Sequence, residues 1–156
     1  MKVRDLMKSQ PRTCTLDDDL GTCGRTMEEV GCGVLPVLDG RRVAGILTDR
    51  DICLALADRD AKPSGVKAKE VISGQVFSCR DSEELRSALR TMRERQVRRL
   101  PVVNEGGALV GLLSLDDVVL ESRAVAATTA DGPLFADVAL TLKAINQHPL
   151  PAVAAG

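Results

Sequence analysis

The chain repeats one segment, and this duplication limits its possible folds more than any other feature of the sequence. Residues 14–36 recur as residues 79–101, an offset of 65 both from 14 to 79 and from 36 to 101. The sequence Gly-Ile-Leu-Thr-Asp-Arg-Asp at 45–51 recurs as Gly-Leu-Leu-Ser-Leu-Asp-Asp at 111–117, where the offset is 66. The extra residue falls between these blocks, where a hairpin turn tolerates a change of length. The chain is therefore predicted to contain two copies of one supersecondary unit.

Each copy has the pattern of a helix, two strands and a second helix. In the first copy, apolar residues recur every three or four positions along the first helix, and Asp17 is a candidate for its cap. The expected elements of the first copy are a short strand at 13–16, a helix at 20–30, paired strands at 34–38 and 43–47, and a helix at 49–58. The second copy keeps the same order.

These elements place the protein in the α/β (α+β) class, as tandem repeats that each contain a small, mostly antiparallel sheet and two helices. The predicted boundaries are 2–59 for the first repeat, 60–68 for a linker broken by Pro and Gly, 69–126 for the second repeat and 127–156 for a tail. In the tail, Leu134, Val138, Leu142 and Ile145 are three or four residues apart. A short amphipathic helix is therefore expected at 134–146.

The charge balance and the hydropathy exclude several classes of protein. Among 156 residues the chain has 21 Lys and Arg and 22 Asp and Glu, a net charge of −1, so it has no overall attraction for nucleic acid or for an anionic membrane. No apolar run is long enough to cross a bilayer, and the first residues lack the apolar region of a signal peptide. We therefore expect a cytoplasmic protein without a membrane partner.

The five cysteines and the single histidine do not form a metal-binding pattern. No Cys-x-x-Cys pair is present, and His148 lies in the tail next to Pro149. We therefore expect no metal site. Cys14 and Cys79 occupy equivalent positions in the two copies, which favours small buried side chains over a redox pair.

One motif in each copy carries polar side chains where a strand is followed by a helix. Thr48 and Asp51 form it in the first copy, Ser114 and Asp117 in the second. A hydroxyl followed three residues later by a carboxylate is typical of a capping box, which satisfies backbone N–H groups at a helix start. The same position can also bind a ligand, because a helix N-terminus attracts phosphate and a carboxylate accepts hydrogen bonds from ribose hydroxyls. The local pattern alone favours the cap.

In duplicate, these signals resemble the cystathionine beta-synthase (CBS) domain family, in which two copies form a Bateman module. The resemblance covers residues 2–124 and is to stand-alone modules of the bacterial type. It rests on Leu-Pro-Val at 35–37 and 100–102, and on the ending Gly-apolar-apolar-Thr/Ser-x-x-Asp in each copy. It implies two sheets packed about a pseudo-twofold axis, with two clefts that can each hold an adenosine-type ligand.

The resemblance also implies a set of binding residues for each cleft. The hydroxyl and carboxylate of each ending contact phosphate and ribose, which gives Thr48 and Asp51 for one cleft, and Ser114 and Asp117 for the other. The opening strand and the residues before Leu-Pro-Val line the adenine pocket. The candidates in those segments are Arg12, Thr13, Gly33 and Val34 in the first copy, and Phe77, Ser78, Val97, Arg98 and Arg99 in the second.

Two arginines distinguish the copies. Arg98 and Arg99 align with Gly33 and Val34, so only the second copy brings guanidinium groups to the mouth of a cleft, where they can bind phosphate. The other interpretation is a solvated face, because further arginines precede them on the charged helix. We expect the cleft of Asp117 to be the stronger site, since its motif belongs to the copy that holds both arginines.

The sequence favours a binding module over an enzyme. The repeats contain no histidine to activate a nucleophile, no Walker lysine loop and no Gly-x-Gly-x-x-Gly. The resemblance implies a regulatory module that senses AMP, ADP, ATP or a related adenosyl ligand, as in energy sensing, and signals by a change of shape or association. No cofactor is required, and magnesium would bind through the nucleotide phosphates. The sequence does not identify the regulated protein.

Two alternatives stay open at this point. One is a constitutive interaction module with empty clefts, and the other is nucleic-acid binding through the arginines between 86 and 99, a property of some members of the family. The resemblance further implies a homodimer of modules, for which Leu20, Met27, Leu85 and Met92 are the expected apolar faces.

Overall fold

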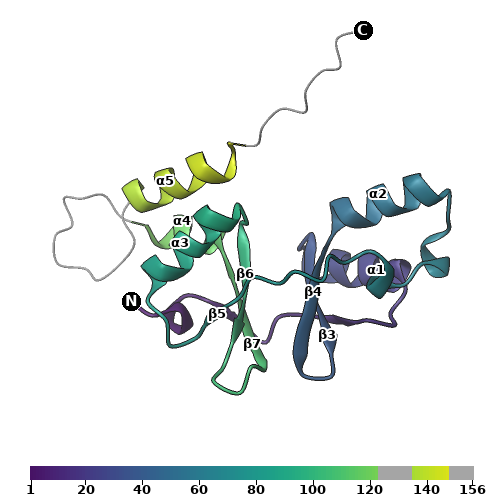
Figure 1. Cartoon of the computed structure of the whole chain (residues 1–156), viewed down its shortest axis with the longest axis horizontal. Coiled ribbons are helices and arrows are strands. Elements are labelled where there is room, and N and C mark those ends of the chain that lie inside the picture. The colour runs from purple at the N-terminus through teal and green to yellow at the C-terminus, as the bar shows by residue number, and fades with distance from the viewer. Residues whose placement is uncertain (123–134, 148–156) are drawn as a thin grey trace, which may run out of the picture.

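The computed structural model describes residues 1–122 and 135–147, which form two adjacent sheets with helices on their outer sides (Figure 1). The first copy contains β2 (Cys14–Thr15), α1 (Leu20–Val30), β3 (Val34–Asp39), β4 (Arg42–Thr48) and α2 (Asp49–Arg59). The second copy contains β5 (Cys79–Arg80), α3 (Leu85–Arg95), β6 (Arg99–Val103), β7 (Leu109–Ser114) and α4 (Leu115–Glu121). The predicted order of helix, strand, strand and helix is confirmed in both copies.

The two sheets have the same local topology. In the first sheet the strand order is β2-β3-β4, with β2 parallel and β4 antiparallel to β3. In the second sheet β5 is parallel and β7 antiparallel to β6. Both hairpins have a bulge at an equivalent place, between Val37 and Leu38 and between Val102 and Val103. The α/β class with small, mostly antiparallel sheets is therefore confirmed.

The opening segments are exchanged between the copies. A short 3-10 turn, η1 (Val3–Asp5), and the strand β1 (Lys8–Ser9) precede the first copy but lie on the second sheet, where β1 pairs antiparallel with β7. Conversely, η2 (Pro63–Gly65) and η3 (Ala68–Glu70) precede the second copy, and Ala68 is buried in the core of the first. Val3 is buried in the core of the second. Each copy therefore completes the core of the other.

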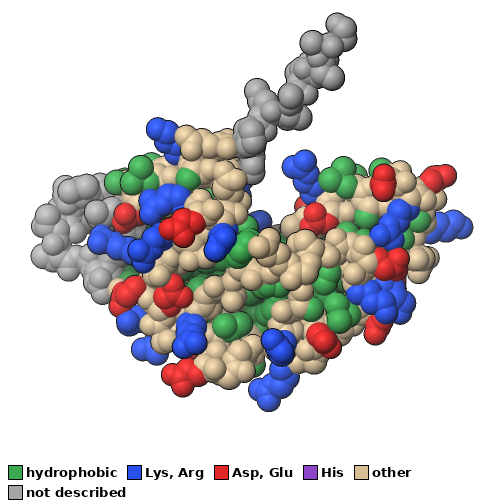
Figure 2. All heavy atoms as spheres, viewed as in Figure 1, with side chains coloured by type: hydrophobic (Ala, Val, Ile, Leu, Met, Phe, Trp, Pro, Cys, Tyr) green, Lys and Arg blue, Asp and Glu red, His purple; other side chains and the backbone are tan. Residues whose placement is uncertain are grey.

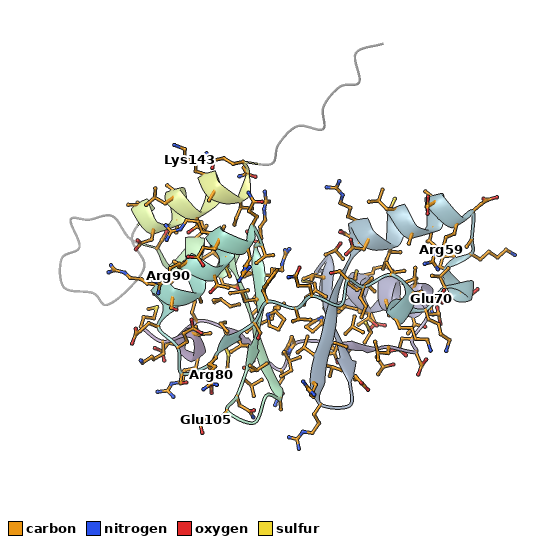
Figure 3. All side chains as sticks on the ribbon, in the orientation of Figure 1. Arg59, Glu70, Arg80, Arg90, Glu105 and Lys143 are labelled. Carbon is orange, nitrogen blue, oxygen red and sulfur yellow. The ribbon has the colours of Figure 1, made fainter. Side chains whose placement is uncertain are left out.

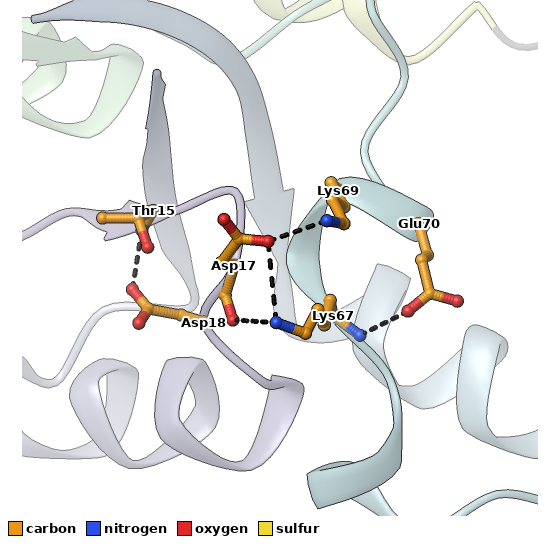
Figure 4. A network of polar contacts seen from close by, with 6 residues as sticks. All are labelled: Thr15, Asp17, Asp18, Lys67, Lys69 and Glu70. Carbon is orange, nitrogen blue, oxygen red and sulfur yellow. Dashed lines mark hydrogen bonds and ion pairs between the residues drawn. The ribbon is translucent and has the colours of Figure 1, made fainter. Parts of the chain in front are cut away.

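A polar network holds the segment between the copies against the first copy (Figure 4). Lys69 Nζ donates to Asp17 Oδ1 at 2.7 Å, and Lys67 Nζ lies 3.5 Å from the same oxygen. Lys69 beside Asp17 holds the pKa of that carboxyl below its usual range. Asp17 was expected to cap α1, but that expectation is wrong, because Asp19 is the N-cap and accepts from the Thr22 N–H at 2.9 Å. These ion pairs are solvent-exposed and direct the path of the chain more than they stabilise it.

A second ion pair joins the same segment to α2. The guanidinium of Arg59 donates to Glu70 Oε2 and to the Glu70 carbonyl, both at 2.9 Å (Figure 3). Arg59 lies in the last turn of α2, where a cation is also favoured by the helix dipole. The end of α2 and the opening segment of the second copy are thereby held together.

The core is aliphatic and lies in two clusters, one for each sheet. Cys14 and Cys79 are buried at equivalent positions, as predicted, and burial raises the pKa of the Cys79 thiol to about 12. The expectation about the dimer faces is wrong. The four residues named for them are buried in the two cores: Leu20, Met27, Leu85 and Met92.

A helix follows the second repeat and packs on it. α5 (Phe135–Ile145) contacts α3 and α4, and its side chains Val138, Thr141 and Ile145 are buried. The helix predicted at 134–146 is thus observed, although Leu134 lies outside the described residues. Within residues 1–122 and 135–147, no helix combines the length and the apolar character needed to cross a membrane.

The exchanged opening segments pack closely against a glycine in each hairpin. A Cβ added at Gly45 would lie 2.7 Å from Ile72 Cδ1 and 2.8 Å from Ile72 Cβ, and one at Gly111 would meet the sulfur of Met7. We predict that Gly45→Ala lowers the free energy of unfolding by about 1–3 kcal/mol, because Ile72 must move. Gly24→Ala is the matched control: nothing lies within 4 Å of its added methyl in α1, so it should gain about 0.5–1 kcal/mol. Denaturant unfolding measures both, and equal effects would contradict the prediction.

Candidate functional site

A cavity of about 510 Å³ lies between the two copies and is called the first cleft here. Figure 2 shows the surface hollowed between α2 and α5. The first copy lines it with Val34, Ile46, Thr48, Arg50 and Asp51, and the second with Ser73, Gln75, Phe77, Gln96, Val97, Arg98 and Arg99. Ile145 of α5 completes the wall. The volume is in the range of small-molecule sites.

Thr48 and Asp51 form a complete capping box at the start of α2. Asp51 Oδ2 accepts from the Thr48 N–H at 2.9 Å and from the Thr48 hydroxyl at 2.6 Å, and the Asp51 N–H donates to Thr48 Oγ1 at 3.1 Å. Among the described residues, no group donates to the other carboxylate oxygen, Asp51 Oδ1. The motif therefore caps the helix, as one interpretation predicted, and still offers one acceptor to the first cleft.

The N-terminus of α2 does not offer the phosphate site that the second interpretation assumed. The N–H groups of its first three residues already have acceptors: Asp49 N donates to the Gly33 carbonyl, Arg50 N to Asp49 Oδ1, and Asp51 N to Thr48 Oγ1. Two carboxylates in this first turn also repel an anion. A phosphate that bound at this helix start would have to displace those acceptors.

The cations of the first cleft come from the opposite wall. Arg98 and Arg99 line it from the start of β6. Arg99 Nη2 lies 3.7 Å from Asp116 Oδ2, and Arg98 Nη2 donates to Asn146 Oδ1 at 2.7 Å. The expectation that these arginines share a cleft with Asp117 is wrong, because the first cleft combines the motif of the first copy with a wall of the second. The arginines face Asp51.

A second cleft of about 270 Å³ lies at the equivalent place around β1. Its walls include Arg12, Cys32, Val34 and Leu112. The capping box recurs at Ser114 and Asp117, with the hydroxyl donating to Asp117 Oδ2 at 2.6 Å. Here, however, Lys8 Nζ lies 3.3 Å from Asp117 Oδ1. The carboxylate oxygen that has no donor in Asp51 is therefore paired in Asp117, and neither Ser114 nor Asp117 lines the second cleft.

The difference between the two carboxylates follows from one residue. Lys8 corresponds to Ser73 at the offset of 65 residues, and Ser73 lines the first cleft without a charge. Only 11% of the Asp117 side chain is exposed, so its pairing with Lys8 also covers it. Arg12, the other cation that lines the second cleft, is paired with Glu29 at 3.2 Å.

The other predicted site residues divide between the clefts. Phe77 and Val97 line the first cleft, and Val34 lines both. Five predicted residues line neither: Thr13, Gly33, Ser78, Ser114 and Asp117. Gly33 instead lies against Asp49, whose carboxylate a Cβ would meet.

Sequence reasoning missed Ile46, Arg50, Ser73, Gln96 and Ile145 of the first cleft. The alternation of side chains along β4, which puts Ile46 on the face of Thr48, would have found one of them. Ile145 gave no such signal, because it lies outside the repeats.

A metal site is not formed by the residues that can be described. No group of three or more His, Cys, Asp or Glu side chains lies close enough to hold an ion within residues 1–122 and 135–147. His148 lies outside those residues.

Comparison with known proteins identifies the family. A model of the CBS domain matches the chain twice, at residues 3–58 and 68–123. The protein belongs to the CBS domain family. CBS domain-containing protein YhcV of Bacillus subtilis is 30% identical over 118 residues, which are 76% of this chain and 83% of YhcV.

Two solved CBS structures are similar to this one. Hypoxic response protein I, solved with two coordinated zinc ions, has a TM-score of 0.70 and 29% identity, covering 77% of this chain and 98% of that one. CBSX2 in complex with AMP has a TM-score of 0.66 and 28% identity, covering 76% of this chain and 93% of that one. Tandem CBS repeats are therefore the architecture of this chain.

The capping boxes should stabilise the protein without any ligand. We predict that Ser114→Ala lowers the free energy of unfolding by about 0.5–2 kcal/mol, because the Asp117 N–H loses its acceptor at the start of α4. Ser82→Ala is the matched control, since Ser82 is exposed and makes no hydrogen bond with its side chain among the described residues. Denaturant unfolding at a fixed protein concentration compares them. A similar small effect at both positions would show that the box contributes nothing.

Proposed function

We propose that this CBS pair is a regulatory module that binds an adenine nucleotide in the first cleft and signals its occupancy by a change of shape or association. The observation that carries the proposal is the placing of Asp51, with one free carboxylate oxygen, opposite Arg98 and Arg99. A nucleotide carries ribose hydroxyls and a phosphate on the same sugar, so its site needs both a hydrogen-bond acceptor and a cation.

The remaining lining suits a purine ring. Ile46, Val97 and Ile145 supply aliphatic surface, and Phe77 is the one aromatic side chain of the cleft. The guanidinium carbon of Arg95 lies 4.9 Å from the centre of the Phe77 ring, so Arg95 covers one face of that ring. An apolar wall with a few fixed polar groups is the usual composition of such sites.

The AMP bound to the similar CBSX2 structure supports an adenine nucleotide as the ligand here. The sequence does not choose among AMP, ADP, ATP and adenosyl ligands such as S-adenosylmethionine. Magnesium would enter the cleft only together with nucleotide phosphates, next to Asp49 and Asp51. Because the nucleotide pool is cytoplasmic, we expect the protein to act there.

The signal would be a shift between two relative packings of the copies. A ligand in the first cleft contacts α2 of one copy and β6 of the other, so it favours the packing in which both walls fit it. The regulated partner would recognise that packing. The shift cannot exceed the difference in the ligand's affinity for the two packings.

One observation favours a second candidate, a constitutive interaction module. Both capping boxes are complete without a ligand, so neither motif needs a nucleotide to be satisfied. Thermal unfolding with AMP, ADP, ATP, S-adenosylmethionine and NAD, with and without Mg²⁺, separates the two. A ligand that binds the native state must raise the midpoint, and no rise with any of them would leave the constitutive module as the better account.

The two carboxylates should differ in their effect on binding. We predict that Asp51→Ala weakens AMP binding about ten-fold or more, because the ligand loses its hydrogen bonds to a charged acceptor. Asp117→Ala should change AMP binding less than about three-fold. Each substitution removes the same capping carboxylate, so each is the control for the other. Isothermal titration measures both, and a site that survives Asp51→Ala but is lost with Asp117→Ala would contradict the assignment.

We further propose that the protein is a homodimer, paired through the outer helices. Leu54 on α2 and Leu120 on α4 are exposed, the latter by 86%, and α2 has no buried residue. We predict that Leu54→Glu combined with Leu120→Glu lowers the mass in solution from twice 16.6 kDa towards 16.6 kDa. Ser82→Glu adds a similar charge at an exposed loop position and should leave the dimer intact. Light scattering that finds only a monomer of the unchanged protein at micromolar concentration would contradict the dimer.

A further inference from the structure

The last turn of α5 is part of the first cleft although α5 lies outside both repeats. Ile145 is buried among the side chains of the second core and also lines the cleft. Figure 1 shows α5 lying along α3, with its last turn directed towards the gap above β6. A ligand in the cleft would therefore meet a wall that the duplicated unit does not supply.

Hydrogen bonds tie this turn to the segment that precedes β6. Gln96 Nε2 donates to the carbonyls of Ala144 at 3.2 Å and Gln147 at 3.4 Å. The last carbonyls of a helix have no partner within it, and Gln96 donates to one of them, that of Ala144. Arg98 Nη2 donates to Asn146 Oδ1 at 2.7 Å. The cleft wall and the end of α5 thus form one hydrogen-bonded unit.

Asn146 is itself held in place. Its Nδ2 donates to the Leu142 carbonyl at 3.0 Å, and its backbone N–H donates to the same carbonyl at 3.0 Å. Since the amide nitrogen is bound to the helix, Oδ1 is turned towards Arg98. Among the described residues, Asn146 is the one hydrogen-bond acceptor of the Arg98 guanidinium, which keeps its other N–H donors for a ligand.

We infer that Asn146 is a positioning residue that holds the Arg98 guanidinium at the mouth of the first cleft for the phosphate of a bound nucleotide. The inference rests on the proposed function and extends it to a residue outside the repeats. An exposed arginine explores many rotamers, and ordering it costs binding free energy. A guanidinium already held by Asn146 has lost part of that freedom before the ligand arrives. By linkage, a phosphate-bearing ligand also stabilises the docking of α5.

The test compares AMP with adenosine, which lacks the phosphate, by isothermal titration of the full chain. Asn146→Ala should weaken AMP binding about three- to ten-fold, the usual loss for one hydrogen bond, and change adenosine binding less than two-fold. In a chain that already carries Arg98→Ala, Asn146→Ala should have no further effect on AMP, because it acts through Arg98.

Leu140→Ala is the matched control on the same helix, since Leu140 is exposed and lines no part of the first cleft. It should leave both ligands unaffected. Equal weakening of AMP and adenosine by Asn146→Ala would show that α5 only supports the fold. Tighter AMP binding would show that Asn146 competes with the phosphate for Arg98. Either result, or no change, overturns this inference while leaving the proposed function intact; failure of AMP and adenosine to bind the unchanged protein would overturn both.

Hydrogen exchange gives an independent measurement. AMP should slow exchange of the amides in residues 135–147 more than adenosine does at equal occupancy, and Asn146→Ala should abolish the difference. Equal protection by the two ligands in the unchanged chain would overturn the inference.

Discussion

The structure depends on the exchange of opening segments between the two copies. Val3 completes the core of the second copy and Ala68 that of the first, so neither copy has a full core alone. The exchange also brings Ile72 against Gly45 and Met7 against Gly111, the glycines of the two hairpins. It also forms the clefts, because the opening segment of each copy lies beside the capping motif of the other copy. Folding and the formation of the site are consequently one event.

The two clefts lie at equivalent positions in the duplicated unit and differ in a few side chains. In both motifs the same atoms form the helix cap: the hydroxyl and one carboxylate oxygen. What remains for a ligand is the second carboxylate oxygen. Lys8 pairs with that of Asp117, whereas Ser73, at the equivalent position, leaves that of Asp51 free. Because the Lys8 side chain is exposed, this ion pair contributes little to stability. Its consequence is for binding, since it occupies the acceptor that Asp117 would otherwise offer to a ligand.

Local elements could be predicted from the sequence, and the pairing of distant ones could not. The periodicity of α1, the hairpins and both capping boxes depend on neighbours in sequence, so Thr48, Asp51, Ser114 and Asp117 were assigned correctly as caps. The partner of Arg98 could not be found in this way, because it depends on which copy supplies each wall. Leu20 and Met92 were expected at the surface for a related reason: the segments that cover them come from elsewhere in the chain. Ile145 belongs to no repeated pattern at all.

The differences between the copies are complementary in space although they are scattered in sequence. The first copy keeps an unpaired carboxylate oxygen, and the second has two arginines where the first has Gly33 and Val34. If each copy used its own wall, these changes would lie in different clefts and neither cleft would hold both charges. Because the walls are exchanged, they meet in one cleft, which α5 closes with Ile145. A ligand that binds both charges must therefore contact both copies, and its binding energy then depends on how they are packed against each other.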